Sequence, residues 1–270
     1  MHSFKNRLLI LIVSLVALAQ GVTIVLTLAS IRSAVRADSI RQLTATRAML
    51  DRTLAERTRL LRAATDAMVG DFAFREAVAT GDRPTVKSAL DNQAGRIGAD
   101  LVVLYAPDGR VLTATSPELF RQASVDLRLP GAGPAAPFAV VGGRPYQIVF
   151  APLRAPQLIA WVALGFALDQ PLARQLAELG GADVSLLYRE RDGSSGIIST
   201  LDAATAAELA ARGPAAAPVG APVLATIGGQ QYLTLSAPLR AQTGTLLLVL
   251  QRSQQNAMSQ FLEMRYALLI

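Results

Sequence analysis

Gly98-Ala-Asp-Leu-Val-Val-Leu-Tyr105 and Gly181-Ala-Asp-Val-Ser-Leu-Leu-Tyr188 are two copies of one apolar strand pattern, 83 residues apart. A second pair has nearly the same spacing, because Tyr146-Gln-Ile-Val-Phe-Ala-Pro-Leu-Arg-Ala155 returns 86 residues later as Tyr232-Leu-Thr-Leu-Ser-Ala-Pro-Leu-Arg-Ala241. Two matches at an almost constant offset indicate an internal repeat. The chain is therefore expected to fold as two tandem modules.

Turn residues define the expected strands of each module. Asp108-Gly109 lies between the apolar runs 99–105 and 110–115, which is typical of a β-hairpin, and Asp192-Gly193 marks the same turn in the second copy. We expect an α+β fold in which each module has an antiparallel sheet flanked by helices. Further strands are expected at 146–152 and 158–168, and helices at 85–97 and 171–179. The residue pairs expected to superpose are Tyr105 with Tyr188 and Pro152 with Pro238.

An uncharged apolar segment precedes the repeat, at residues 8–31 (LLILIVSLVALAQGVTIVLTLASI). At about 1.5 Å per residue, a helix of this length crosses a hydrocarbon core of roughly 30 Å. Lys5 and Arg7 come before the segment, so the positive-inside rule places the N-terminus in the cytoplasm. We expect a single N-terminal transmembrane helix in a bacterial inner membrane, with the bulk of the chain periplasmic. A cleaved signal peptide is the alternative.

A long helix is expected between the membrane segment and the first module. Residues 33–79 contain no proline, and their apolar side chains recur at helical spacing. Arg47 and Arg57 interrupt this stripe. We expect one face of the helix to be packed against the protein and the other to be exposed to solvent. We also expect two copies of the chain to form a homodimer through this helix. The stripe consists of Ile40, Leu43, Leu50, Leu54, Leu61 and Met68.

The last residues of the sequence are apolar as well. After Arg265 the chain reads Tyr-Ala-Leu-Leu-Ile, which we interpret as the start of a second transmembrane segment. A short apolar tail that docks on the fold is the alternative. The expected division of the chain is 1–7 cytoplasmic, 8–31 transmembrane, 32–79 long helix, 80–168 membrane-distal module, 169–252 membrane-proximal module, and 253–270 a helix that leads into the second transmembrane segment.

Composition excludes several kinds of chemistry. The chain has no cysteine, and its one histidine, His2, stands beside the first Met. Disulfides, thiolate or histidine metal sites and Cys- or His-based catalysis are therefore excluded from the folded part. We expect no catalytic residue, no metal and no cofactor. The net charge is +6 at pH 7, but the arginines are scattered and usually lie beside acids, so no nucleic acid is expected as a partner.

Two stretches carry a family resemblance: Val69-Gly-Asp-Phe-Ala-Phe-Arg-Glu-Ala-Val-Ala-Thr-Gly-Asp82 and Arg96-Ile-Gly-Ala-Asp100. Together with the apolar segments and the tandem modules, they make the chain resemble the double Cache (PAS-like) extracytoplasmic sensor domains of bacterial transmembrane receptors. It is similar to the group found upstream of GGDEF and EAL domains, although neither of these signatures occurs here. The pattern of an Arg followed closely by Trp-Tyr, seen in amino-acid-binding Cache groups, is absent as well.

The resemblance implies a signal-input domain with no enzymatic activity of its own. Such a domain binds a small ligand and passes a conformational change through membrane helices to a cytoplasmic output, here cyclic-di-GMP turnover by a diguanylate cyclase or phosphodiesterase. Two alternatives stay open. One is the input domain of a histidine kinase or chemotaxis receptor, and the other is a membrane-anchored periplasmic structural or assembly protein.

Five residues of the membrane-distal module are the candidate ligand contacts. Arg96 at the end of the second helix presents paired donors, which suit the carboxylate of an anionic or zwitterionic ligand. The second module has Leu179-Gly180 before its Gly-Ala-Asp, so the distal module is the expected site. A salt bridge or a helix C-cap for Arg96, and core packing for the tyrosines, are the alternatives. The candidates are Arg96, Asp100, Tyr105, Arg110 and Tyr146.

Overall fold

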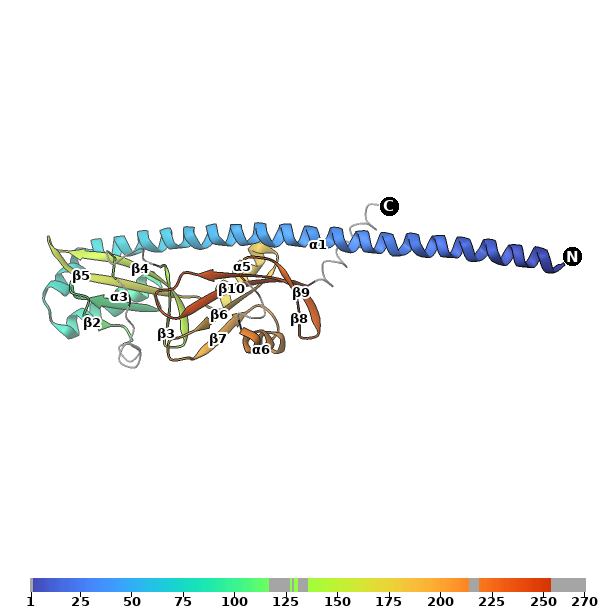
Figure 1. Cartoon of the computed structure of the whole chain (residues 1–270). Coiled ribbons are helices and arrows are strands. Elements are labelled where there is room, and N and C mark those ends of the chain that lie inside the picture. Colours follow the sequence, from blue (N-terminus) through green and yellow to red (C-terminus); the bar gives the residue numbers. More distant parts are fainter. Residues whose placement is uncertain (1, 117–126, 128, 131–135, 214–218, 254–270) are drawn as a thin grey trace.

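The computed structural model describes the backbone of residues 2–116, 127, 129–130, 136–213 and 219–253. Within the first helix, side chains are described from residue 13 onward, apart from 28–29, 31–32 and 34–35. Figure 1 shows two sheet-containing modules side by side along one long helix, which extends well beyond them at its N-terminal end. From residue 254 on, the segment expected to lead into a second membrane helix lies outside the described residues.

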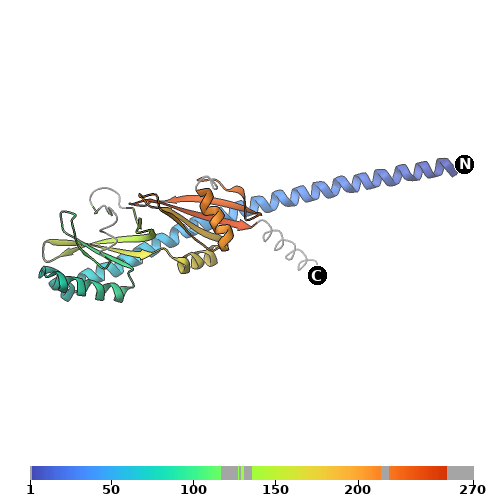
Figure 2. The ribbon, with the colours of Figure 1, turned by 90° about the horizontal axis from the view of Figure 1, so that it is seen from below.

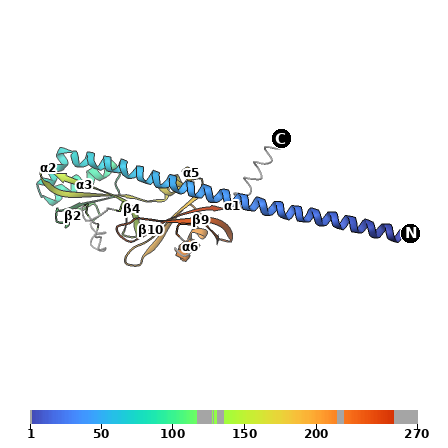
Figure 3. The same cartoon turned by 45° about the horizontal axis from the view of Figure 1, so that its top comes forward.

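The helix α1 (His2–Gly70) packs along both modules (Figures 1 and 3). Leu50 and Leu54 are buried in the core of the second module, whereas Met68 is buried in the core of the first. The apolar stripe therefore joins the two modules through one helix. No helix in the described part of the chain combines the length and the apolar character of a membrane span. The anchor expected at 8–31 stays a prediction.

The structure divides the helix that was expected over 32–79. The helix α1 ends at Gly70, and the short helix α2 (Phe72–Ala79) follows it. Asp71 separates them, because its backbone is extended and its carboxylate accepts the N–H of Phe74 at 3.2 Å, as an N-cap does. The spacing of apolar residues continues across this cap, so periodicity alone did not reveal the break.

The first module contains the helix α3 and a five-stranded antiparallel sheet. The carboxylate of Asp82 caps α3 by accepting the N–H of Thr85 at 3.1 Å, and Gly98 ends the helix with a φ of 66°. The strand order is β2-β1-β5-β4-β3. The elements are α3 (Arg83–Ile97), β1 (Leu101–Tyr105), β2 (Val111–Ala114), β3 (Phe138–Val141), β4 (Arg144–Arg154) and β5 (Leu158–Ala167).

The second module repeats this design with strand order β7-β6-β10-β9-β8. The prediction of an α+β fold with two antiparallel sheets is therefore confirmed. The strands β3 and β8 were not expected from the sequence, and neither was α6. The elements are α5 (Gln170–Gly180), β6 (Asp183–Arg189), β7 (Ser195–Ser199), α6 (Ala203–Arg212), β8 (Val223–Ile227), β9 (Gln230–Leu239) and β10 (Thr245–Ser253).

Each sheet has an inner face, which is turned toward α1, and an outer face on the opposite side. The helices α1, α2 and α3 cover the inner face of the first sheet, and α1 and α5 cover that of the second. The helix α6 packs through Leu209 on the outer face of the second sheet. Figures 1 and 2 show α5 and α6 on opposite sides of this sheet.

The two sheets differ in register by one residue, and this overturns one expectation. Trp161 on β5 lies opposite both Tyr105 and Pro152. The equivalent Leu247 lies opposite Pro238, as expected, but its partner on β6 is Leu187 and not Tyr188.

Side chains alternate between the faces of a strand, so a shift of one residue moves a side chain to the other face. Tyr105 accordingly packs on the outer face of its sheet, whereas Tyr188 packs against the inner core. The prediction that these tyrosines superpose is wrong. Both tyrosines stand seven residues after the glycine that ends the preceding helix, Gly98 or Gly181, so the shift does not come from the length of that connection but from how the strand pairs with its neighbour.

The modules are held together where β3 meets the second module. The carboxylate of Glu190 accepts the N–H groups of Gly142 and Gly143, at 3.1 and 2.6 Å. The buried Thr243 hydroxyl accepts the N–H of Val140 at 3.1 Å and donates to the carbonyl of the same residue at 2.8 Å. Because β3 is an edge strand, this contact joins the first sheet to the β9–β10 connection.

Candidate ligand-binding sites

The structure places Tyr105 and Tyr146 on the same face of the first sheet but far apart. Both side chains are buried on the outer face, with 2% and 4% of their surface exposed. Tyr105 lies opposite Trp161 on β5, and Tyr146 lies opposite Ala167. Six residues of strand separate these positions, which corresponds to about 20 Å. The two tyrosines therefore do not line one small pocket.

The charged candidates are distributed over different parts of the module. Arg96 lies in the helical layer on the inner side, where its exposed guanidinium stands 3.8 Å from the carboxylate of Asp71. Arg110 is exposed in the β1–β2 turn and pairs with Asp108 at 2.7 Å. Arg96 and the tyrosines thus lie on opposite sides of the sheet, and a small ligand on the outer face does not reach this arginine.

Two candidates, Asp100 and Tyr146, lie near the same end of the sheet. The carboxylate of Asp100 accepts the N–H of Ala167 at 2.8 Å, and Ala167 is the residue opposite Tyr146. Burial raises the pKa of Tyr146 above its ordinary value; the nearby Arg144 opposes this rise and Asp100 adds to it. The phenol therefore stays protonated at neutral pH. Its hydroxyl makes no hydrogen bond to the residues that the structure describes.

The outer face of the second sheet is polar where that of the first is apolar. Ile148 and Phe150 of β4 correspond to Thr234 and Ser236 of β9. Both hydroxyls are fully buried and have no hydrogen-bond partner in the described part of the chain. Beside them, Ser185 Oγ lies 2.7 Å from Ser199 Oγ and also hydrogen-bonds to the side-chain amide of Gln251. This polar face was not predicted, although Thr234-Leu-Ser236 in place of Ile148-Val-Phe150 indicates it.

Asp183 stands at the edge of this polar face, and its contribution to the stability of the fold depends on pH. Burial raises the pKa of its carboxyl above the ordinary value of 3.8, and a hydrogen bond from Thr200 opposes the rise. The folded state therefore binds the proton more tightly than the unfolded chain does. The carboxyl stabilises the fold at low pH, and this contribution is lost as the pH rises through the folded-state pKa.

We expect Asp183→Asn to match the wild type in stability below about pH 3.8 and to become the more stable protein as the pH rises to 7. The amide keeps an oxygen that accepts the hydrogen bond of Thr200, while the buried charge is removed. Urea unfolding of both proteins between pH 3 and 8, followed by circular dichroism, measures the difference. A difference that does not change with pH would contradict the burial of this carboxyl.

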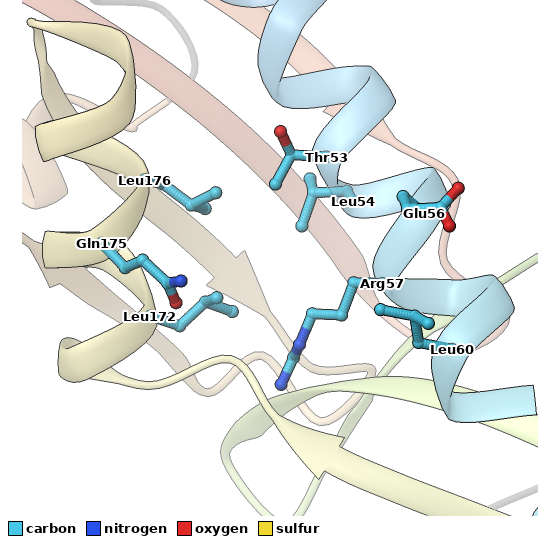
Figure 4. Close-up of a pocket in the computed structure, with 8 residues that line it drawn as sticks. All are labelled: Thr53, Leu54, Glu56, Arg57, Leu60, Leu172, Gln175 and Leu176. Atoms are coloured by element: carbon cyan, nitrogen blue, oxygen red, sulfur yellow. The ribbon is translucent and has the colours of Figure 1, made fainter. Parts of the chain in front are cut away.

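A pocket of about 430 Å³ lies between α1 and α5 (Figure 4). Arg57 extends from α1 into it, and one of its terminal nitrogens donates to the side-chain oxygen of Gln147 at 2.7 Å. Gln147 is buried on the inner face of β4, where its amide donates to the carbonyl of Leu54 and to the hydroxyl of Thr58. Burial lowers the pKa of Arg57, while Asp169 and Asp100 raise it. The interruption of the apolar stripe at Arg57 was the signal for this site in the sequence.

Within the described residues, no group of three or more His, Asp or Glu side chains could hold a metal ion. The described part of the chain offers two sheet faces with buried polar atoms and a pocket with one arginine. Two modules of one strand order in tandem along a helix define the class of double sensory domains. The family described as a double sensory domain of two-component sensor kinase, dCache_3, matches residues 36–255, and the chain belongs to it.

No curated protein matches the chain. Among solved structures, it is similar to the ligand-binding domain of the Pseudomonas fluorescens chemoreceptor CtaA in complex with L-isoleucine, with 16% identity, a TM-score of 0.43, and coverage of 85% of this chain and 98% of that one. The Pseudomonas aeruginosa PAO1 chemoreceptor PctB in complex with L-Arg matches with 13% identity, a TM-score of 0.43, and 84% and 91% coverage. The sensor domain of the V. cholerae histidine kinase DctB matches with 14% identity, a TM-score of 0.41, and 77% and 93% coverage.

Proposed function

We propose that this chain is the extracytoplasmic signal-input domain of a transmembrane receptor. The observation that carries the proposal is the family match over residues 36–255. In this proposal residues 8–31 anchor the domain in the inner membrane, and two copies of the chain form a homodimer through α1. Exposed apolar side chains of α1, outside both modules, support the anchor. They include Val13, Leu15, Val16, Leu18, Val22, Ile24, Val25 and Leu26.

The ligand in this proposal is a small zwitterionic or anionic metabolite that binds on the outer face of the membrane-distal sheet, at the end near Tyr146. The hydroxyl of Tyr146, which makes no hydrogen bond to the described residues, offers it one hydrogen bond, and Asp100 offers a negative charge for an ammonium group. A change at this face reaches the second module through β3, which Thr243 and Glu190 hold. The signal then passes to α1 and β10, which both belong to the core of that module.

The output that we propose is cyclic-di-GMP turnover, for which the resemblance to sensors upstream of GGDEF and EAL domains is the support. A histidine kinase is the second candidate. The description of the matching family, which names two-component sensor kinases, favours it.

A thermal-shift screen of the full chain in detergent tests the ligand site. The panel consists of the proteinogenic amino acids and small dicarboxylates. We expect at least one compound to raise Tm by about 5–10 °C at a hundredfold excess over its Kd. Tyr146→Phe should then weaken binding about three- to tenfold, because one neutral hydrogen bond is lost.

The matched control is Tyr232→Phe, which makes the same change at the equivalent position of the second module. It should leave the affinity unchanged, and so should Arg96→Ala. Loss of binding in Arg96→Ala alone would place the ligand in the helical layer and overturn the outer-face site.

A further inference from the structure

The pocket between α1 and α5 has the size and the lining of a binding site for a small molecule. Its volume of about 430 Å³ falls in the range of small-molecule pockets, which is about 300–1,000 Å³. Four leucines supply its apolar wall, two from each helix: Leu54, Leu60, Leu172 and Leu176. The pocket is distinct from the outer face of the first sheet, because it lies on the inner side, beside the long helix.

Arg57 is the only lysine or arginine among the described lining residues, and it has no acidic partner among the described residues within 4 Å. It makes no ion pair of the kind that Arg59 makes with Glu56 at 2.9 Å. The side-chain oxygen of Gln147 accepts a hydrogen bond from one terminal nitrogen of Arg57, and this contact fixes the orientation of the Arg57 guanidinium. A guanidinium has five N–H donors, so most of them remain for another acceptor. Figure 4 shows Arg57 directed into the space between the helices, and Glu56 directed away from α5.

We propose that this pocket binds a small aliphatic monocarboxylate, with the carboxylate on Arg57 and the hydrocarbon chain between the leucines of α1 and α5. A guanidinium matches a carboxylate in shape and charge, and the pair can form two parallel hydrogen bonds. The leucine side chains remove the hydrocarbon from water. Among the lining residues Gln175, Glu56 and Leu60 are exposed and Thr53 is half-buried, so one side of the pocket is open to water.

The position of the pocket gives such a ligand a regulatory role. Leu54 belongs to the core of the second module, whereas Gln147, the partner of Arg57, belongs to the sheet of the first. A bound carboxylate therefore adds contacts where α1 passes from one module to the other. It stabilises one relative position of α1 and α5, so it shifts any conformational equilibrium of α1 that a ligand on the outer face also uses.

The test uses the full chain and a series of straight-chain carboxylates, from propionate to octanoate, below their micellar concentrations. Isothermal titration calorimetry measures Kd, and the primary alcohols of the same lengths serve as uncharged probes. We expect binding that tightens with chain length and that the alcohols do not reproduce. Arg57→Gln should weaken it about ten- to a hundredfold, since a charge-assisted contact is lost.

Arg52→Gln is the matched control, because Arg52 is an exposed arginine of the same helix that does not line the pocket. It should bind like the wild type. Gln175→Phe, a change at an exposed position of α5, fills the pocket and should abolish binding without unfolding the protein. Tyr146→Phe should leave carboxylate binding intact, which separates this site from the outer face.

Three results would overturn the proposal. They are an absence of binding across the series, equal binding by the alcohols, and carboxylate binding that survives both Arg57→Gln and Gln175→Phe. A Gln175→Phe variant that loses self-association instead of carboxylate binding would show that a second copy of the chain occupies the pocket.

Discussion

Leu50→Ala is expected to lower the free energy of unfolding by about 2–5 kcal/mol, one of the two largest effects of a single substitution that the structure predicts. The side chain is fully buried where α1 joins the core of the second module. Alanine removes the branched end of the side chain and leaves a cavity between the helix and the sheet. Neighbours from both elements are held by regular secondary structure, so they cannot collapse fully into the space.

Leu60→Ala is the control for this prediction. It makes the same chemical change ten residues further along the helix, at a side chain that is 64% exposed. Its expected cost is about 1 kcal/mol or less. Urea unfolding followed by circular dichroism compares the two variants. Equal effects of the two substitutions would contradict the packing of α1 against the second module.

Gly244→Ala is expected to cost about 2–5 kcal/mol, from two sources that act together. The backbone φ of Gly244 is +68°, a conformation that favours glycine. A Cβ at this position would also collide with the carbonyl oxygen of Arg189 and would stand 3.1 Å from the Cβ of Val140. Arg189 is in β6, where its backbone oxygen cannot move aside, so the β9–β10 connection would have to shift relative to both β6 and β3.

Gly229→Ala separates the two sources. Gly229 has a similar φ of +73°, but an added Cβ would meet no atom within 4 Å. This variant should lose only the conformational cost, about 1–2 kcal/mol. The difference between the two variants, measured by urea unfolding, reports the close packing around Gly244, against Arg189 in its own module and Val140 in the other. A Gly244→Ala protein as stable as Gly229→Ala would contradict the close packing of Gly244 against Arg189 and Val140.

Local chemistry was sufficient to predict the elements at the start of each module. The carboxylate of Asp82 and the Asp-Gly turns at 108–109 and 192–193 act over two to three residues, so their effect can be read without the rest of the chain. The strands β3 and β8 have no such signal. They are edge strands of four and five residues, and their place depends on β4 and β9 beside them.

The candidate site was less predictable than the fold. The sequence places Arg96, Asp100 and Tyr105 within ten positions, yet the sheet separates the arginine from the tyrosine. Arg57 was noted only as a defect in an apolar stripe, because its partner Gln147 lies 90 residues away. Contacts between distant segments bring such residues together, and a single sequence does not state those contacts.

The amino-acid sequence was sufficient to predict two α+β modules in tandem, because a repeated pattern of apolar residues and turns requires the same sheet to form twice. It did not determine which side chains face α1. Tyr105 and Tyr188 end two segments that both begin with Gly-Ala-Asp, and each stands seven residues after the glycine that ends its helix, yet they lie on opposite faces of their sheets. Register along a strand is decided by the neighbours with which it bonds, and those neighbours become adjacent only in the tertiary structure.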